Sequence, residues 1–124
     1  MKIFNDDSPL YLQLRQHIEE LILERALPEE AAIPSMRIMA RDFNLNPLTV
    51  ANALSLLVDE GVLYKRRGVG MYVSTGARER IINMRGQDFL AQKLEPVLRH
   101  ARQLELPLEE VIKLSKDIYG GSDE

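Results

Sequence analysis

The residues with the clearest chemical potential in this 124-residue chain are three consecutive cations, Lys65-Arg66-Arg67, followed directly by Gly68. Cations at a turn can neutralise phosphate groups, and a glycine lets the backbone approach a ligand closely. Strand-like runs at 62–66 and 71–73, with a Gly-containing loop at 67–70 between them, predict a β-hairpin that carries these charges at its tip. Such a tip suits contact with a DNA backbone or minor groove, although a solvated loop or a charged edge strand would also explain it.

A second set of polar residues marks the start of a short helix after Pro34. Ser35 is a suitable N-cap, and Arg37 falls in the first helical turn, where free backbone N–H groups attract phosphate. We therefore expect Ser35 and Arg37 to form a phosphate clamp. A tight turn should follow at Asn44, a residue that tolerates the left-handed conformation that often ends a helix.

The next helix has clear start and stop signals. Asn46 followed by Pro47 is a preferred pair for the N-cap and the first helical position, and Gly61 is a favoured residue just beyond a helix end. Apolar residues recur at offsets of 0, 3, 4, 7 and 8 from Val50, which predicts one buried face.

The opposite face of that helix carries Leu48, Asn52 and Ser55, with Thr49 beside them. Helix-turn-helix proteins place the second helix of the pair in the major groove of DNA, where its N-terminal residues reach the bases. Asparagine can form two hydrogen bonds with adenine, and leucine or threonine methyl groups can contact the thymine methyl group. This face therefore has side chains of the right kind to distinguish base pairs.

The hydrophobic pattern predicts the scaffold that holds these residues. We expect a first helix over 8–26, with Ser8 as its N-cap and Pro9 as its first residue. The two later helices and the hairpin follow in the order of a winged helix-turn-helix. The predicted fold class is mainly α (α+β), with a winged helix-turn-helix DNA-binding domain over 1–75.

The remaining residues, 76–124, are expected to form a small helical dimerisation region. The apolar spacing predicts helix over 81–104, with an interruption at Gly86 and a kink or break at Pro96, and a last helix over 108–119. Two helices cannot bury so many apolar side chains alone, so we expect two chains to pair symmetrically and bury them between the subunits. The expected homodimer interface comprises Ile82, Phe89, Leu90, Leu94, Val97, Leu98, Ala101, Val111, Ile112 and Ile118.

The net charge, taken alone, argues against binding to nucleic acid. The chain has a formal net charge of −3, whereas small nucleic-acid-binding domains are usually basic. Much of the acid lies on the first helix and the loop after it, at Glu19, Glu20, Glu24, Glu29 and Glu30. We therefore expect a polarised surface whose cations gather on the side that faces DNA.

Other chemistries lack support in the sequence. The chain has no cysteine, only His17 and His100 as histidines, and no serine in a nucleophile elbow, so we expect no catalytic residue, metal or cofactor. The pair Gly68-x-Gly70 is too short for a dinucleotide motif. No apolar run is long enough to span a bilayer, and the first residues lack a signal-peptide core, so we expect a cytoplasmic protein without membrane association.

Five motifs lie in register over residues 9–73. They are Pro9-Leu10-Tyr11-Leu12-Gln13, Ile33-Pro34-Ser35-Met36-Arg37-Ile38-Met39-Ala40, Asn46-Pro47-Leu48-Thr49-Val50, Leu57 with Gly61, and Gly68-Val69-Gly70-Met71-Tyr72-Val73. Together they resemble the N-terminal domain of the GntR family of bacterial transcription regulators. The resemblance implies that Ser35, Arg37, Asn46, Leu48, Thr49, Asn52, Arg66, Arg67 and Gly68 face DNA, and the charge run adds Lys65 to this set.

The Asn-Pro helix start, the short C-terminal region and the chain length are similar to the YtrA subfamily. That resemblance implies dimerisation through a small helical region, no large effector-binding domain and, often, a repressor function. The chain departs from the family pattern in the loop at 25–30 and in having Leu57-Val58 where Leu-Glu is usual. Ala51 replaces a usual basic residue, which removes one expected contact with phosphate or base.

The sequence therefore predicts a DNA-binding transcriptional regulator that acts as a homodimeric repressor on a palindromic double-stranded operator. The sequence leaves open whether a small-molecule effector binds between the C-terminal helices, because no residue pattern indicates a pocket there. The alternative hypothesis is a winged-helix protein-interaction module that docks a partner chain through the C-terminal helices. A stand-alone small-molecule binder would need a pocket that the sequence does not indicate.

Overall fold

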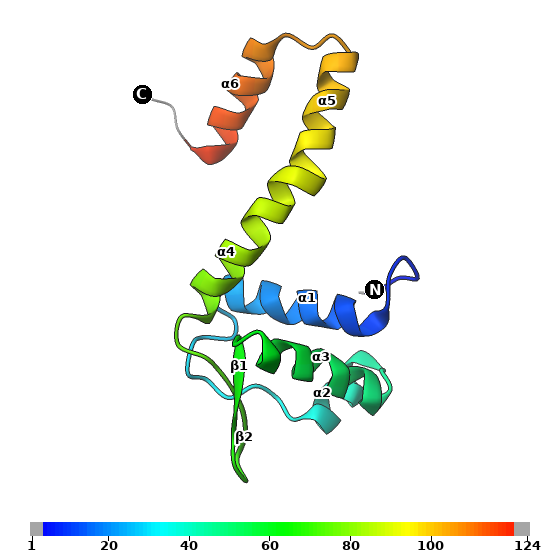
Figure 1. Ribbon diagram of the computed structural model, residues 1–124, viewed down its shortest axis with the longest axis vertical. Coiled ribbons are helices and arrows are strands. Elements are labelled where there is room, and N and C mark those ends of the chain that lie inside the picture. The colour runs from blue at the N-terminus through cyan, green and yellow to red at the C-terminus, as the bar shows by residue number, and fades with distance from the viewer. Residues whose placement is uncertain (1–3, 121–124) are drawn as a thin grey trace. The chain divides into compact units, whose positions relative to one another are not determined.

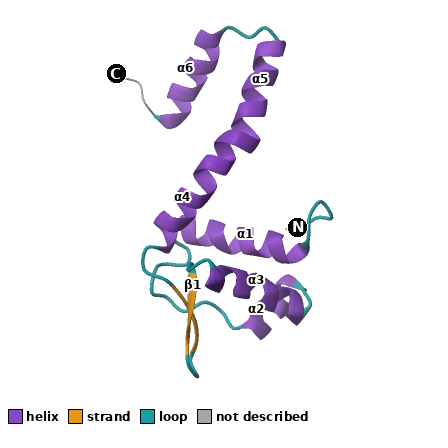
Figure 2. Cartoon of the chain, in the orientation of Figure 1, coloured by secondary structure: helices purple, strands orange, loops and turns teal. Residues whose placement is uncertain are grey.

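A computed structural model describes residues 4–120 of the chain (Figure 1). The chain divides into two compact units, the first ending at Met84 and the second beginning at Arg85. Helices dominate, and the first unit holds one small antiparallel sheet of two strands (Figure 2). The prediction of a mainly helical fold with a winged helix-turn-helix is confirmed.

The first helix, α1, spans Leu10–Leu23 and is shorter than predicted at both ends. The prediction that Ser8 caps it is wrong, because Pro9 has an extended backbone and occupies the N-cap position without a side-chain cap. The Gln13 amide instead donates to the backbone oxygens of Asn5 and Ser8, which holds the preceding segment against the first turn. The helix stops where Arg25 adopts a left-handed conformation, with φ of 64°.

The predicted helix-turn-helix is confirmed with its caps. Helix α2 spans Met36–Phe43, and its N-cap Ser35 accepts a hydrogen bond from the backbone N–H of Ile38. Asn44 ends α2 in the left-handed conformation, with φ of 54° and ψ of 49°. Helix α3 then spans Pro47–Asp59, so the short turn fixes the direction in which α3 leaves α2.

The wing consists of β1, Leu63–Arg66, and β2, Gly70–Val73, with the turn between them. The strands pair antiparallel, with Tyr64 opposite Tyr72. The segment 30–33 runs along the other edge of β2, where the N–H of Ile33 donates to the oxygen of Met71 and the N–H of Val73 donates to Ala31. The loop after α1 therefore supports the wing from the side.

One apolar core holds these elements together. Helix α1 packs on α3, and buried residues of α2, the hairpin and the start of α4 belong to the same apolar cluster. Nine large apolar side chains in this core are almost completely buried, and each contributes roughly 1.5–3 kcal/mol relative to an exposed position. They are Leu14, Ile18, Ile22, Val50, Leu57, Val62, Leu63, Val73 and Ile81.

Helix α4 spans Ala77–Phe89 and joins the two units along the chain. Its first turns belong to the core, with Ala77 and Ile81 fully buried. The predicted interruption at Gly86 is wrong, because the helix continues through this residue. An isolated glycine costs a helix only about 1 kcal/mol relative to alanine, which the neighbouring turns can offset.

A kink or a break was expected at Pro96; the helical chain is not broken there, but a π-helical turn, η1, replaces regular α-helix at Leu90–Leu94. Helix α5 follows directly over Glu95–Gln103, with the proline at its start. A proline inside a regular helix has no N–H to donate and clashes with the carbonyl four residues earlier. Widening the turn before Pro96, where the Glu95 N–H donates to the Leu90 oxygen, accommodates the ring without ending the helix.

The last helix, α6, spans Leu108–Tyr119, as predicted, and ends at Gly120 in a left-handed conformation. Among the described residues of the second unit, 85–120, none is buried within the single chain. Apolar side chains of this unit are thus largely open to solvent, Ile118 for example at 73%.

Candidate nucleic-acid interface

Helix α3 presents one exposed face, as the sequence predicted. Leu48, Asn52 and Ser55 lie on the side opposite the buried Val50 and Leu57 and form what we term the recognition stripe. Leu48 is 67% exposed, a large value for an apolar side chain in a folded unit. Thr49, beside the stripe, is half-buried.

The polar atoms of two predicted DNA-facing residues are already used within the fold. The Asn46 side-chain oxygen accepts a hydrogen bond of 2.8 Å from the backbone N–H of Leu48. The Ser35 hydroxyl oxygen accepts one of 3.2 Å from Ile38. Both residues are exposed, but each stabilises the first turn of its helix, so neither oxygen is reserved for a ligand.

The predicted cations are exposed and lie on two elements. Arg37 projects from the first turn of α2, and it forms no ion pair with any residue between 4 and 120. Lys65 and Arg67 in the wing are likewise exposed, as is Gly68, whose φ of 72° places it in the left-handed region. These positions leave the charges available to a polyanion.

Stacked aromatic rings orient one of the wing cations. The rings of Tyr64 and Tyr72 stack across the strands with their centroids 5.9 Å apart. The Arg66 guanidinium carbon lies 4.8 Å from the centre of the Tyr72 ring, a cation–π contact. Arg66 is therefore held along the wing, whereas the other two cations of the run have no such support.

Glu30, which the sequence places in an acidic loop, fastens the wing to the rest of the unit. The Tyr64 hydroxyl donates to one carboxylate oxygen at 2.7 Å, and the Thr75 hydroxyl donates to the other. The Thr75 hydrogen bond, followed by that of Tyr64, lowers the pKa of Glu30. The same contact with Glu30 raises the pKa of Tyr64.

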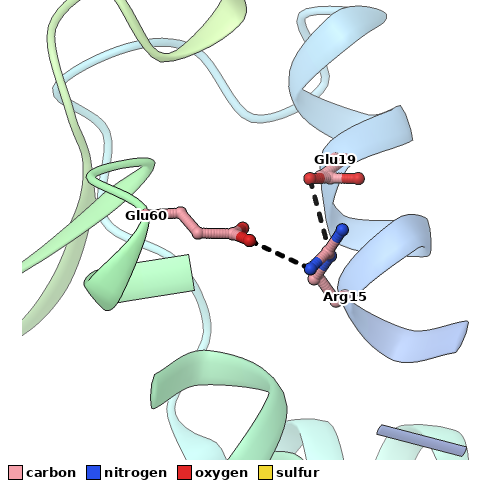
Figure 3. Close-up of polar contacts among 3 residues, drawn as sticks. All are labelled: Arg15, Glu19 and Glu60. Carbon is pink, nitrogen blue, oxygen red and sulfur yellow. Dashed lines mark hydrogen bonds and ion pairs between the residues drawn. The ribbon is translucent and has the colours of Figure 1, made fainter. Parts of the chain in front are cut away.

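Helix α1 is tied to the end of α3 by charged side chains (Figure 3). Arg15 donates to the Glu60 carboxylate at 3.0 Å, and its Nε lies 3.8 Å from a carboxylate oxygen of Glu19. The prediction that Glu19 belongs to an exposed acidic face is wrong, because this side chain is only 1% exposed. Its burial beside Arg15 removes one charge from the acidic surface that the sequence indicated.

The described part of the chain has a cavity of about 600 Å³ between the end of α1 and the start of α4. Two of its charged side chains are engaged in the fold. Glu29 accepts hydrogen bonds from the backbone N–H groups of Gly76 and Arg78, and the Arg78 guanidinium donates to the Leu23 carbonyl. These contacts stabilise the junction between the α1 loop and α4.

Within residues 4–120, no three acidic or histidine side chains come close enough to hold a metal ion. No helix in the same range is long and apolar enough to cross a membrane. The residues predicted for a dimer interface lie on α4, η1, α5 and α6, and each is exposed or half-exposed in the single chain.

Comparison with known proteins gives a consistent picture. A family model described as bacterial regulatory proteins, gntR family, matches residues 10–73, which is just over half of the chain. The transcriptional repressor YtrA of Bacillus subtilis is 28% identical over 118 residues, covering 92% of this chain and 90% of that protein. The transcriptional regulator YhcF of the same organism is 26% identical and covers 95% of this chain and 96% of its own length.

Solved structures of bacterial transcription regulators are also similar to this chain. A GntR family regulator from Listeria monocytogenes is 25% identical, with a TM-score of 0.72 over 92% of this chain and 98% of that one. A transcriptional regulator from Oenococcus oeni is 27% identical, with a TM-score of 0.75 over 94% of this chain and 95% of that one. The DNA-binding domain of AraR, in complex with operator ORX1, is 25% identical, with a TM-score of 0.54 over 57% of this chain and 92% of that domain.

Proposed function

The chain belongs to the GntR family of bacterial regulatory proteins, and from this premise we propose that it is a transcriptional repressor that binds a palindromic operator as a homodimer. The observation that carries the proposal is the recognition stripe of α3, exposed in the same unit as Arg37 and the wing cations. Short polar and apolar side chains suit entry into a major groove, and the cations suit the flanking phosphates.

Two likenesses support the finer parts of this proposal. The YtrA relative, which is named a repressor, matches nearly the whole chain. The AraR domain that resembles the first unit was solved on an operator. We therefore assign base reading to α3 and backbone attachment to Arg37 and the wing, while Ser35 caps the helix that carries Arg37.

The homodimer is supported by the exposed apolar side chains of the second unit. A soluble protein seldom leaves large apolar side chains open unless they form a contact surface. Pairing of two identical faces is the commonest way to cover such a surface. Two subunits would then bind half-sites separated by about one turn of the double helix, roughly 34–36 Å, or by a multiple of that distance.

The test of DNA binding uses the full-length protein and duplexes that it selects from a random library, with affinity followed by fluorescence anisotropy at several salt concentrations. Arg37→Ala and a wing variant with Lys65, Arg66 and Arg67 all changed to Ala should bind more weakly. Each lost phosphate contact should reduce the slope of log affinity against log salt by about 0.9. Lys113→Ala, which removes an exposed cation from α6, is the matched control and should keep the wild-type slope.

If the protein selects no duplex, or if both variants bind as tightly as the wild type, the proposed function is wrong. The first result would favour the alternative of a protein-interaction module that docks a partner chain through the C-terminal helices.

A further inference from the structure

Helix α3 contains no lysine or arginine, although it is the element proposed to enter the major groove. Its only charged residue is Asp59, at its C-terminal end. Guanine is most often read by arginine or lysine, which donate to its O6 and N7 atoms. Helix α3 lacks those donors, so its readout depends on neutral side chains.

We propose that α3 is a reader of A·T base pairs, with Asn52 pairing with an adenine and Leu48 contacting the methyl group of a nearby thymine. This inference rests on the proposed function, which it deepens by naming the base pairs that α3 selects. The cations on α2 and the wing then attach the protein to DNA without determining which bases α3 accepts.

Asn52 has the position and the free atoms that adenine readout needs. It lies in the middle of the recognition stripe, and it makes no hydrogen bond to any residue that the structure describes. The carboxamide of an exposed asparagine can accept from N6 and donate to N7 of adenine at the same time.

Leu48 supplies the apolar partner. It lies one turn before Asn52, in the first turn of α3, where recognition helices approach the bases most closely. The hydrogen bond from its N–H to Asn46 fixes that turn in place. Contact between the exposed Leu48 side chain and a thymine methyl group removes apolar surface of both partners from water, which is favourable for binding.

The residues proposed to read the bases and the cations proposed to contact phosphate lie on different elements. Arg37 is on α2, and Arg66 is held against the Tyr72 ring in the wing. Both are suited to phosphate or minor-groove contacts, which depend strongly on salt. Contacts through Leu48 and Asn52 release no counterions and should depend little on salt.

The experiment uses the duplex that the wild-type protein selects, with base analogues placed at each thymine and adenine of a half-site in turn. Uracil in place of thymine removes only the methyl group, and 7-deaza-adenine removes only N7. For the wild type, one uracil position should weaken binding about fourfold, the factor expected from one buried methyl group. One deaza position should weaken binding about tenfold.

Two variants assign these effects to their residues. Leu48→Ala should bind the selected duplex more weakly and lose the uracil effect, and Asn52→Ala should lose the deaza effect. Both should keep the wild-type salt slope, whereas Arg37→Ala should lower the slope and keep both analogue effects. Leu10→Ala, an exposed leucine on α1, is the matched control and should keep the uracil effect.

The inference is overturned if the wild type tolerates every uracil and deaza substitution, or if Leu48→Ala and Asn52→Ala leave the analogue effects intact. Those outcomes would leave the proposed DNA binding standing. Failure to select any duplex would instead overturn the proposed function, and this inference with it.

Discussion

The polar atoms of the DNA-facing candidates differ in whether the fold already uses them. Asn46 and Ser35 cap helices, so their side-chain oxygens contribute mainly to stability. Asn52 and Arg37 have no hydrogen-bonding partner within the described residues, so their polar atoms are available to a ligand. A substitution at the first pair is expected to act through folding, and one at the second pair through binding.

Glu30 should make the stability of the first unit depend on pH. Hydrogen bonds from Thr75 and Tyr64 lower its pKa below the ordinary value of 4.5, so the carboxylate stabilises the fold above that value. This contribution is lost as the pH falls through the lowered pKa of the folded chain. We expect Glu30→Gln to unfold at lower urea concentration than the wild type at neutral pH, and the two midpoints to converge in strong acid.

Changes at Thr75 provide the control for this effect. Thr75→Val, which removes the hydroxyl, should reproduce part of the loss, and Thr75→Ser should restore the stability. If the urea midpoints of the wild type and Glu30→Gln changed with pH in parallel, this role of Glu30 would be contradicted.

At the scale of the helices and strands, local signals were predictable from the sequence and long-range contacts were not. The caps of α2 and α3 involve residues within three positions of each other, so residue types alone predicted them. Glu30 contacts Tyr64 and Thr75, which lie 34 and 45 residues further along the chain, and no local sequence pattern indicates these contacts. The burial of Glu19 likewise depends on how α1 packs on α3, because its amphipathic pattern alone places an acidic residue in water.

At Pro96 and Gly86, the residue type alone did not determine the local backbone structure. The sequence predicted that regular α-helix could not continue at Pro96, but the widened turn at Leu90–Leu94 is one of several ways to accommodate a proline. Gly86 lowers helix propensity by a small amount only, and the turns on either side outweigh it. Of the candidate site, the sequence identified the recognition stripe and the cations, but it missed the supports supplied by Glu30 and Tyr72.

The N-cap of α3 should contribute measurably to the stability of the helix that we propose reads the bases. Asn46→Ala removes the acceptor of the Leu48 N–H and should lower the free energy of unfolding by about 1 kcal/mol. Asn46→Ser keeps a cap and should restore most of this loss. Urea denaturation followed by circular dichroism would measure both, and equal stability of all three proteins would exclude a capping role.

At the scale of the whole molecule, charge and apolar surface are unevenly distributed. The net charge of −3 does not oppose DNA binding, because exposed cations gather at Arg37 and along 65–67. Among residues 4–120, every buried side chain lies in the first unit, whereas the helices of the second unit leave their apolar side chains exposed or half-exposed. In our proposal, the first unit contacts DNA and the second contacts the other subunit.

The proposed dimer can be broken with carboxylates placed on the exposed apolar residues of the second unit. Leu98→Glu combined with Ile112→Glu would bury charge in an apolar contact, which is costly without a partner. Light scattering at micromolar concentration should give twice the chain mass for the wild type and the single-chain mass for the variant. Gln103→Glu, at an exposed polar position of α5, is the control and should remain dimeric. A wild-type monomer, or a variant that stays dimeric, would rule out this interface.

The lack of cations on α3 also affects how this regulator can evolve. Exchanges among neutral residues at positions 48, 52 and 55 leave the charge of the chain, and with it the ionic attachment to DNA, unchanged. These side chains are exposed, so most exchanges cost little stability. In our proposal, one copy of a duplicated gene can therefore acquire a new target sequence by single substitutions while it keeps its fold and its ionic contacts with DNA.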